Sequence, residues 1–145
     1  MHKFFIPGNV PSLKNSKVKT SRGIFPSKTV VSYLKDLGIK RYSVRDKVVE
    51  EYVRRENLFR KYLATFPTEL EYPIHMGFHF IRKSKRDFDF NNATQIIQDL
   101  LVAHNYIEDD SMRFLLPYPL QIEGLYYSIN PKNPGVILKV DYDRR

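Results

Sequence analysis

The stretch YPIHMGFHFIRK, residues 72–83, decides the fold because its hydrophobic residues alternate with a period of two. Such alternation is typical of a strand with one buried face. The other face would carry Gly77 and two histidines, His75 and His79. Because the chain has no cysteine and no third ligand stands nearby in the sequence, we interpret these histidines as polar packing rather than a zinc site. The buried face would consist of Tyr72, Ile74, Met76, Phe78 and Phe80.

A helix is predicted after this strand, from about residue 92 to residue 105, because the hydrophobic spacing becomes that of a helix. Asn91 or Asn92 can cap its first turn, and Gln95 follows Asn92 at the spacing of a capping box. The apolar side of the helix would consist of Ile96, Ile97, Leu100 and Leu101.

Towards the N-terminus, residues 3–6 predict a short strand that ends at the Pro-Gly pair following it. Residues 9–28 are polar and rich in lysine, which predicts a long basic loop. Residues 27–37 fit a short helix. Residues 44–66 carry apolar side chains at helical spacing and basic ones mostly outside that stripe, which predicts a longer helix. Its basic face is either an ordinary solvated surface or a phosphate-contacting one.

Towards the C-terminus, residues 113–118 and 121–129 are expected to be extended, and residues 135–142 alternate as a final strand. The predicted order of elements is then β, α, α, β, α, β, β. This order indicates the α+β class, with a small mixed or antiparallel sheet and helices packed on it. No repeat or linker interrupts the chain, so residues 1–145 are expected to form a single domain.

The composition excludes several classes of protein. The 145 residues contain no cysteine, which rules out disulfide frameworks, thiol nucleophiles and iron–sulfur clusters. With 42% hydrophobic and 28% charged residues, the chain has the composition of a folded globular protein. No segment approaches the roughly 20 continuous apolar residues of a membrane span, so no membrane partner is expected. The start, MHKFFIPGNVPS, lacks the apolar stretch of a secretory signal, which predicts a cytoplasmic location.

The formal net charge of +8 is unevenly distributed. Residues 1–65 hold fifteen Lys and Arg against five acids, a net of +10, whereas residues 66–145 hold nine against eleven, a net of −2. A strongly basic half concentrates polyanions, and nucleic acid is the commonest partner of such a surface. The alternative is that these residues only keep a small protein in solution.

An unusual set of acids lies in the second half of the chain. Asp87 and Asp89 precede the predicted helix, Asp99 lies within it, and Asp109 and Asp110 follow it. If these carboxylates converge, they repel one another unless a hard cation such as Mg²⁺ lies between them. A magnesium site beside basic residues suits phosphodiester hydrolysis. Taken singly, each acid has an ordinary explanation as a solvated surface charge or part of an exposed turn.

The segment DFNNATQIIQDLLVAHNYIEDD, from Asp89 to Asp110, resembles the signature of RusA-type Holliday junction resolvases. That signature has an Asp-x-Asp-Asn segment opening a helix, a lysine within the helix, a later aspartate and an Asp-Asp pair after it. The opening FFIPGNVPSLKNS resembles the family's first strand and its Pro-Ser-x-x-Asn loop, and GVILKV resembles its last strand. The resemblance implies a homodimeric, magnesium-dependent α+β endonuclease that cuts four-way DNA junctions, commonly encoded by phages and prophages and acting in recombination and repair.

The gapless match to this family gives each site residue a role. The resemblance implies that Asp89, Asn91, Asp109 and Asp110 hold the metal, and that the catalytic set is Asp89, Asn91, Gln95 and Asp110. Asn91 stands where the family has its second acid, and Gln95 stands where it has the lysine. Gln95 would face the phosphate, while Asp87, Asn92 and Asp99 would shape the site. An alternative register, in which Asp87 and Asp89 are the two acids, puts Phe90 at the asparagine position.

DNA contacts are expected from the basic residues that lie beside the acidic set or in the first loop. The candidates are Lys14, Asn15, Lys83, Lys85 and Arg86. A second hypothesis is a protein of the same fold that binds junctions without cutting them, because Asn91 and Gln95 are neutral. A third, an RNA-binding or host-factor-binding module, rests only on the basic charge and the aromatic residues. Affinities for junction, duplex and RNA at one salt concentration would distinguish it.

Overall fold

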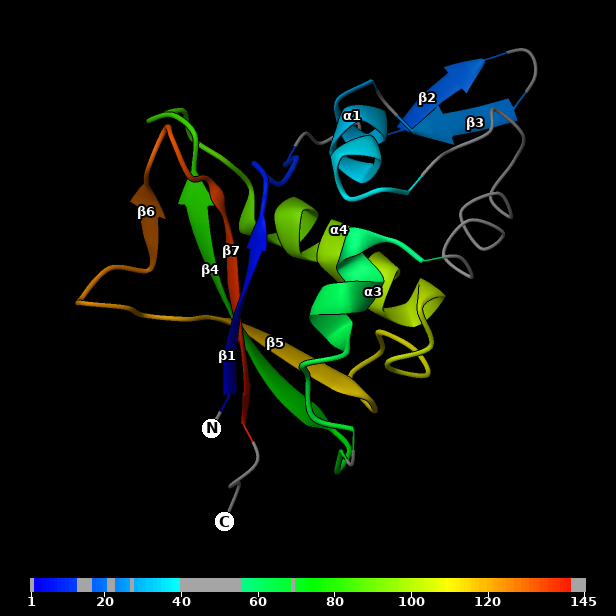
Figure 1. The fold of residues 1–145 in the computed structure, drawn as a ribbon, viewed down its shortest axis with the longest axis vertical. Coiled ribbons are helices and arrows are strands. Elements are labelled where there is room, and N and C mark those ends of the chain that lie inside the picture. The colour runs from blue at the N-terminus through cyan, green and yellow to red at the C-terminus, as the bar shows by residue number, and fades with distance from the viewer. Residues whose placement is uncertain are drawn as a thin grey trace.

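A five-stranded mixed sheet forms the centre of the computed structural model (Figure 1). The structure describes residues 2–12, 17–20, 23–26, 28–39, 56–68 and 70–141. The strand order is β1-β7-β4-β5, and β6 also pairs with β4. Pairs β1–β7 and β7–β4 are antiparallel, whereas β5 and β6 each run parallel to β4. The strands are β1 (His2–Pro7), β4 (Ile74–Arg82), β5 (Leu115–Pro119), β6 (Tyr127–Ile129) and β7 (Gly135–Asp141).

Three helices lie among the described residues: α1 (Lys28–Asp36), α3 (Leu58–Leu63) and α4 (Phe90–Ala103). Figure 1 shows α3 and α4 on the same side of the sheet, and α1 with a hairpin of β2 (Lys17–Thr20) and β3 (Gly23–Pro26) at one end. This arrangement confirms the α+β prediction with a mixed sheet. The prediction of one long loop over residues 9–28 is wrong for residues 17–20 and 23–26, which pair as that hairpin.

The hydrophobic core lies between the sheet and α4. The period-two prediction is confirmed within β4, since Met76, Phe78 and Phe80 are at most 1% exposed and face the same side. It is wrong for Tyr72, which lies before the strand and is 44% exposed. Helix α4 covers them through Ile97 and Leu101, which are fully buried. Alternating valine and leucine side chains of β7 and one isoleucine of β1 complete this layer: Ile6, Val136, Leu138 and Val140.

The opposite side of β4 is more buried than a half-exposed strand would be. Tyr118 of β5 covers Gly77, so closely that a Cβ there would lie 2.9 Å from the tyrosine ring. His79 is only 2% exposed, with Nδ1 2.8 Å from the carbonyl oxygen of Leu120 and Nε2 2.7 Å from the hydroxyl oxygen of Ser128. The interpretation of His79 as polar packing is therefore confirmed. The middle of β4 is therefore buried on both faces, because α4 covers one side and Tyr118 with the partners of His79 covers the other.

Two predicted elements need correction. A continuous helix over residues 44–66 is wrong at Asn57, whose extended backbone (φ −148°, ψ 170°) and side chain instead form the N-cap of α3. Residues 40–55 lie outside the described part of the chain. A continuous strand over residues 121–129 is also wrong, because Ile122 and Leu125 close a tight turn around Glu123 (φ 51°) and Gly124 (φ 82°). Positive φ values reverse the chain and interrupt the extended conformation.

Candidate functional site

The first turn of α4 is capped by Asp89. Its side-chain oxygen accepts a hydrogen bond of 3.2 Å from the backbone N–H of Asn92, and its backbone is extended, with φ −96° and ψ 113°. The helix therefore begins two residues earlier than predicted, and the expected caps, Asn91 and Asn92, lie inside it. A carboxylate at this position both satisfies a free backbone donor and lies at the positive end of the helix dipole. One oxygen of Asp89 thus has a structural role.

A row of polar side chains runs along the exposed surface of α4. Asn91, Gln95 and Asp99 are spaced by four residues, so they lie on one face of the helix, and all three are exposed. The amide Nε2 of Gln95 donates to Oδ1 of Asp99 at 2.7 Å. The same nitrogen donates to Oδ2 of Asp110 at 2.7 Å. Both amide hydrogens of Gln95 are therefore engaged by carboxylates, and a phosphate-facing role would require displacing one of them.

The turn after α4 brings Asp110 back to the helix. Asn105 adopts a left-handed backbone (φ 60°), and its N–H donates to the carbonyl of Val102 at 2.9 Å. The next N–H, that of Tyr106, donates to the carbonyl of Leu101 at 2.9 Å. This pair of bonds is the Schellman termination of a helix, for which asparagine is a suitable left-handed residue. Ile107, 2% exposed, then anchors the returning chain in the core.

The described residues place two of the predicted acids together and leave the others apart. Asp99 and Asp110 accept from the same nitrogen, and Mg²⁺ commonly uses one or two carboxylates together with water and phosphate oxygens. Across the described part of the chain, no three or more acidic or histidine side chains are grouped so that they could hold a metal ion. Asp87 and Asp109 are exposed, and Asp89 is half-buried at the helix cap. A metal role for Asp89, Asn91 and Asp109 remains a prediction.

A buried arginine joins the first loop to the segment before α4. Arg82, at the end of β4, is 9% exposed and donates from Nη1 to the carbonyl oxygen of Val10 and from Nη2 to Ser12 Oγ at 3.4 Å. Burial lowers the pKa of its guanidinium. The backbone N–H of Lys83 donates to Asn9 Oδ1 at 3.0 Å. Residues 9–12 and 82–83 are therefore held together, although they are far apart in sequence.

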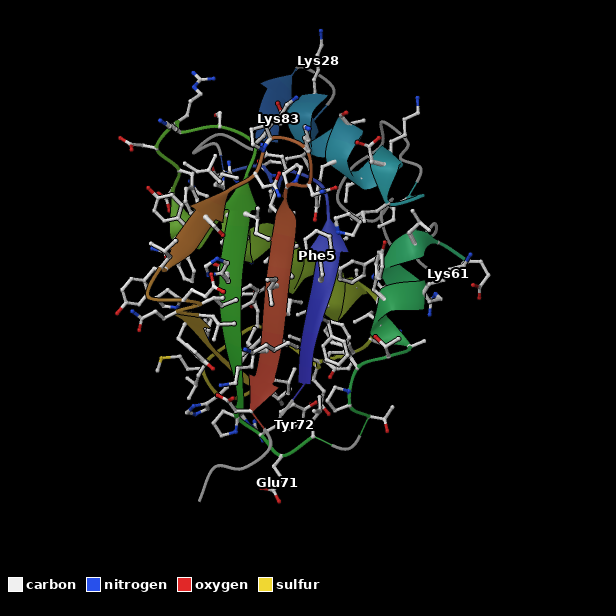
Figure 2. The ribbon with its side chains drawn as sticks, turned by 60° about the vertical axis from the view of Figure 1, so that its left-hand side comes forward. Phe5, Lys28, Lys61, Glu71, Tyr72 and Lys83 are labelled. Carbon is white, nitrogen blue, oxygen red and sulfur yellow. The ribbon has the colours of Figure 1, made fainter. Side chains whose placement is uncertain are left out.

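The predicted DNA-contacting residues fall into two groups. Lys83, Lys85 and Arg86 are exposed on the segment between β4 and α4. Figure 2 shows Lys83 at the same end of the sheet as Lys28 of α1. Lys14 and Asn15 lie outside the described residues, just beyond the loop that Arg82 holds. Arg82, a residue that the sequence analysis did not select, holds Val10 and Ser12 beside the segment that carries Lys83, Lys85 and Arg86.

Sequence reasoning also missed an aromatic cluster beside this segment. The ring of Phe88 lies 4.6 Å from the guanidinium carbon of Arg82 and 5.2 Å from the ring of Tyr127 on β6. It also packs edge-to-face on Phe80 at 5.8 Å. The signal for it in the sequence is the Asp-Phe-Asp-Phe pattern of residues 87–90, whose rings alternate with the acids.

Comparisons with known proteins add no assignment. No protein family model matches the chain, and no curated protein matches it either. Within the described segments, none of the helices combines the length and apolar character that crossing a membrane requires.

Proposed function

We propose that this protein is a magnesium-dependent endonuclease that cuts four-way DNA junctions. The observation that carries the proposal is the bridge from Gln95 to both Asp99 and Asp110, which holds two carboxylates side by side on an exposed surface. Paired carboxylates of this kind suit a hard divalent cation bound to a phosphate group. The resemblance of Asp89 to Asp110 to the RusA-type signature supports the same reaction.

In this proposal, Asp99 and Asp110 contribute the carboxylates that would hold Mg²⁺. Asn91, which also carries a side-chain oxygen, lies two turns before Asp99 on the same face of α4. When bound, Mg²⁺ supplies charge stabilisation to the attacking and leaving oxygens of a phosphodiester. Lys83 and Lys85 bind backbone phosphates before α4. Gln95 holds the two carboxylates in position. A two-fold homodimer would place two such sites on the symmetric strands of a junction.

The test is cleavage of a synthetic four-way junction by the purified protein with Mg²⁺. Symmetric nicks in the wild type that disappear in Asp110→Asn, with junction binding retained, support the proposal. The matched control is Asp36→Asn, an exposed acid at the end of α1, which should cut like the wild type. A folded, dimeric wild type that leaves the junction intact with every divalent cation tested refutes it.

A second candidate function is junction binding without cleavage. The observation that favours it concerns Gln95, whose amide is neutral and has both hydrogens donated to carboxylates. The RusA-type signature, which this segment resembles, has a cationic lysine at that position. Such a protein would bind branched DNA tightly and with strong salt dependence, yet leave it uncut. Gain of cutting in the double variant Asn91→Asp, Gln95→Lys supports this second function. Efficient cutting by the wild type rejects it.

A further inference from the structure

The turn before β6 and β6 itself expose a run of large apolar side chains, which we call the 125–129 patch. Its exposed members are Leu125 (55%), Tyr126 (59%), Tyr127 (46%) and Ile129 (41%). Single exposed apolar residues are common on protein surfaces, but a contiguous group usually marks a binding site. Four such residues within five consecutive positions therefore require an explanation.

The patch is held on a defined base. Leu125 and Ile122 exchange backbone hydrogen bonds of 2.8 and 2.9 Å across the turn. Ser128 bonds to the buried His79, and the N–H of Asn130 donates to the carbonyl of Arg82 at 2.9 Å. The bonds of Ser128 and Asn130 tie the C-terminal end of the patch to β4, and those of Leu125 close the turn at its other end. Its rings are therefore presented on an ordered surface, which lowers the entropic cost of binding a ligand.

Cations lie beside the patch. Phe88, whose ring is 5.2 Å from that of Tyr127, ends the segment that contains Lys83, Lys85 and Arg86, and these three side chains are exposed. The guanidinium carbon of Arg82 also lies 4.6 Å from the centre of the Phe88 ring. The surface thus combines exposed aromatic rings with neighbouring positive charge. This is the combination that binds unpaired nucleotides, through stacked bases and neutralised phosphates.

We propose that Tyr126 and Tyr127 form a stacking surface for the base faces that are left uncovered at the branch point of a DNA junction. Lys83, Lys85 and Arg86 hold the flanking phosphates. The inference rests on the proposed function, because it takes branched DNA as the ligand. In a continuous duplex the faces of the bases are covered by their neighbours, so the tyrosines contribute little. At an open branch point they are accessible, so the patch distinguishes a junction from linear DNA.

The experiment uses junctions carrying 2-aminopurine at the branch point, whose fluorescence reports base stacking, together with affinity measurements at several salt concentrations. The wild type should change the 2-aminopurine signal on binding. The double variant Tyr126→Ala, Tyr127→Ala should lose that change and bind the junction at least about tenfold more weakly. Its affinity for linear duplex should stay within about twofold of the wild-type value, because no phosphate contact is removed. The slope of log affinity against log salt concentration, here called the salt slope, should stay within the same range for the same reason.

Three further variants separate stacking from folding and from charge. The double variant Tyr126→Phe, Tyr127→Phe keeps both rings and should behave as wild type. Tyr72→Ala removes a tyrosine of similar exposure (44%) at the opposite end of the sheet (Figure 2) and should also bind normally. By contrast, Lys83→Ala should reduce the salt slope by about 0.9 while retaining the fluorescence change.

The outcomes distinguish this inference from the proposed function. If the wild type prefers junctions but the alanine double variant binds them equally well, the stacking surface is refuted while junction recognition stands. The same conclusion follows if the double variant weakens junction and linear duplex by the same factor. A wild type with no preference for branched DNA overturns both proposals. If the wild type binds single-stranded RNA more tightly than the junction, the assignment of DNA as the ligand of the 125–129 patch is also overturned.

Discussion

Gln95 and Asp110 lie 15 positions apart in the chain, and one hydrogen bond of 2.7 Å from Nε2 to Oδ2 joins them. The same nitrogen donates to Asp99 one turn further along α4. Neutral donors with two hydrogens can hold two carboxylates together without cancelling their charge. The bridge therefore couples the turn after the helix to the helix itself and leaves a negative surface.

Removing the bridge should destabilise the fold moderately. Gln95→Met keeps the length of the side chain and loses both hydrogen bonds, so the free energy of unfolding should fall by about 0.5–1.5 kcal/mol. Gln95→Lys should recover most of that loss, because an ammonium can contact both carboxylates. Urea denaturation measures both changes. Gln121→Met, at another exposed glutamine, should have no effect, and an equal loss there would contradict a specific role for the bridge.

The close approach of Tyr118 to Gly77 should make Gly77→Ala costly. The added Cβ would lie 2.9 Å from two ring carbons of Tyr118, whose hydroxyl donates to Asp141 at 2.7 Å and limits its movement. We expect a loss of about 1–3 kcal/mol, typical of overpacking. In a Tyr118→Ala background the same substitution should cost much less, which a double-mutant cycle measures. Additive losses would show that the ring is not the obstacle.

Stability should fall in mild acid because of His104. Its Nδ1–H donates to the carbonyl of Leu100 at 2.7 Å, and its Nε2 lies 3.2 Å from Asn57 Nδ2. Since Asn57 Oδ1 already accepts from the N–H of Arg60 at 2.7 Å, its amide nitrogen faces the imidazole, which must then accept. Burial lowers the pKa of His104, the bond to Leu100 raises it, and nearby Arg60 lowers it.

The direction in which the free energy of unfolding changes with pH follows from the linkage between protonation and folding. The folded pKa lies below the unfolded value of about 6.5, so the unfolded state binds a proton first as the pH falls. The stabilising contribution is complete above that unfolded value and is lost as the pH falls through the folded pKa. Urea denaturation between pH 7.5 and 5 should show this decline in the wild type and a shallower one in His104→Gln. Parallel curves would contradict the role of His104.

The hydroxyl of Tyr33 should contribute nothing favourable to stability. It is buried and has no hydrogen-bond partner among the described residues, and its burial raises the pKa of the phenol above its usual range. Tyr33→Phe should leave the free energy of unfolding unchanged or raise it by about 1 kcal/mol, because no bond is lost. The comparison is Tyr106→Phe, which loses a bond of 2.7 Å to the carbonyl of Pro67 and should be destabilised. A clear loss in Tyr33→Phe would reveal a partner for the hydroxyl.

Replacing Arg82 should release the first loop. Arg82→Met keeps the apolar stem but loses the bonds to Val10 and Ser12, and because those partners are neutral no unpaired charge remains. The free energy of unfolding should therefore fall by only about 1–3 kcal/mol. Hydrogen exchange at the amide of Lys83, which donates to Asn9, should accelerate far more than exchange in the middle of β7. Uniform acceleration across the sheet would instead indicate global destabilisation.

Local periodicity was sufficient for the strongest elements. The alternation around Phe78 predicted β4 and its buried face, and the spacing of Ile97 and Leu101 predicted α4, because each pattern reflects one buried side of a regular element. Gln95 and Asp99 could likewise be placed on this helix. The start of the helix could not be placed, since Asp89, Asn91 and Asn92 are all acceptable caps and only the backbone of residue 89 selects among them.

The sequence by itself determined the α+β class, the central strand and the helix that follows it, because hydrophobic spacing is a property of neighbouring residues. Only the tertiary structure decided that Asp110 returns to Gln95 through the left-handed Asn105, and that Arg82 joins the start of the first loop to the end of β4. It also decided that Tyr127 lies against Phe88. These contacts depend on where the chain reverses and on which buried polar groups find partners, and both are settled only when the whole core packs.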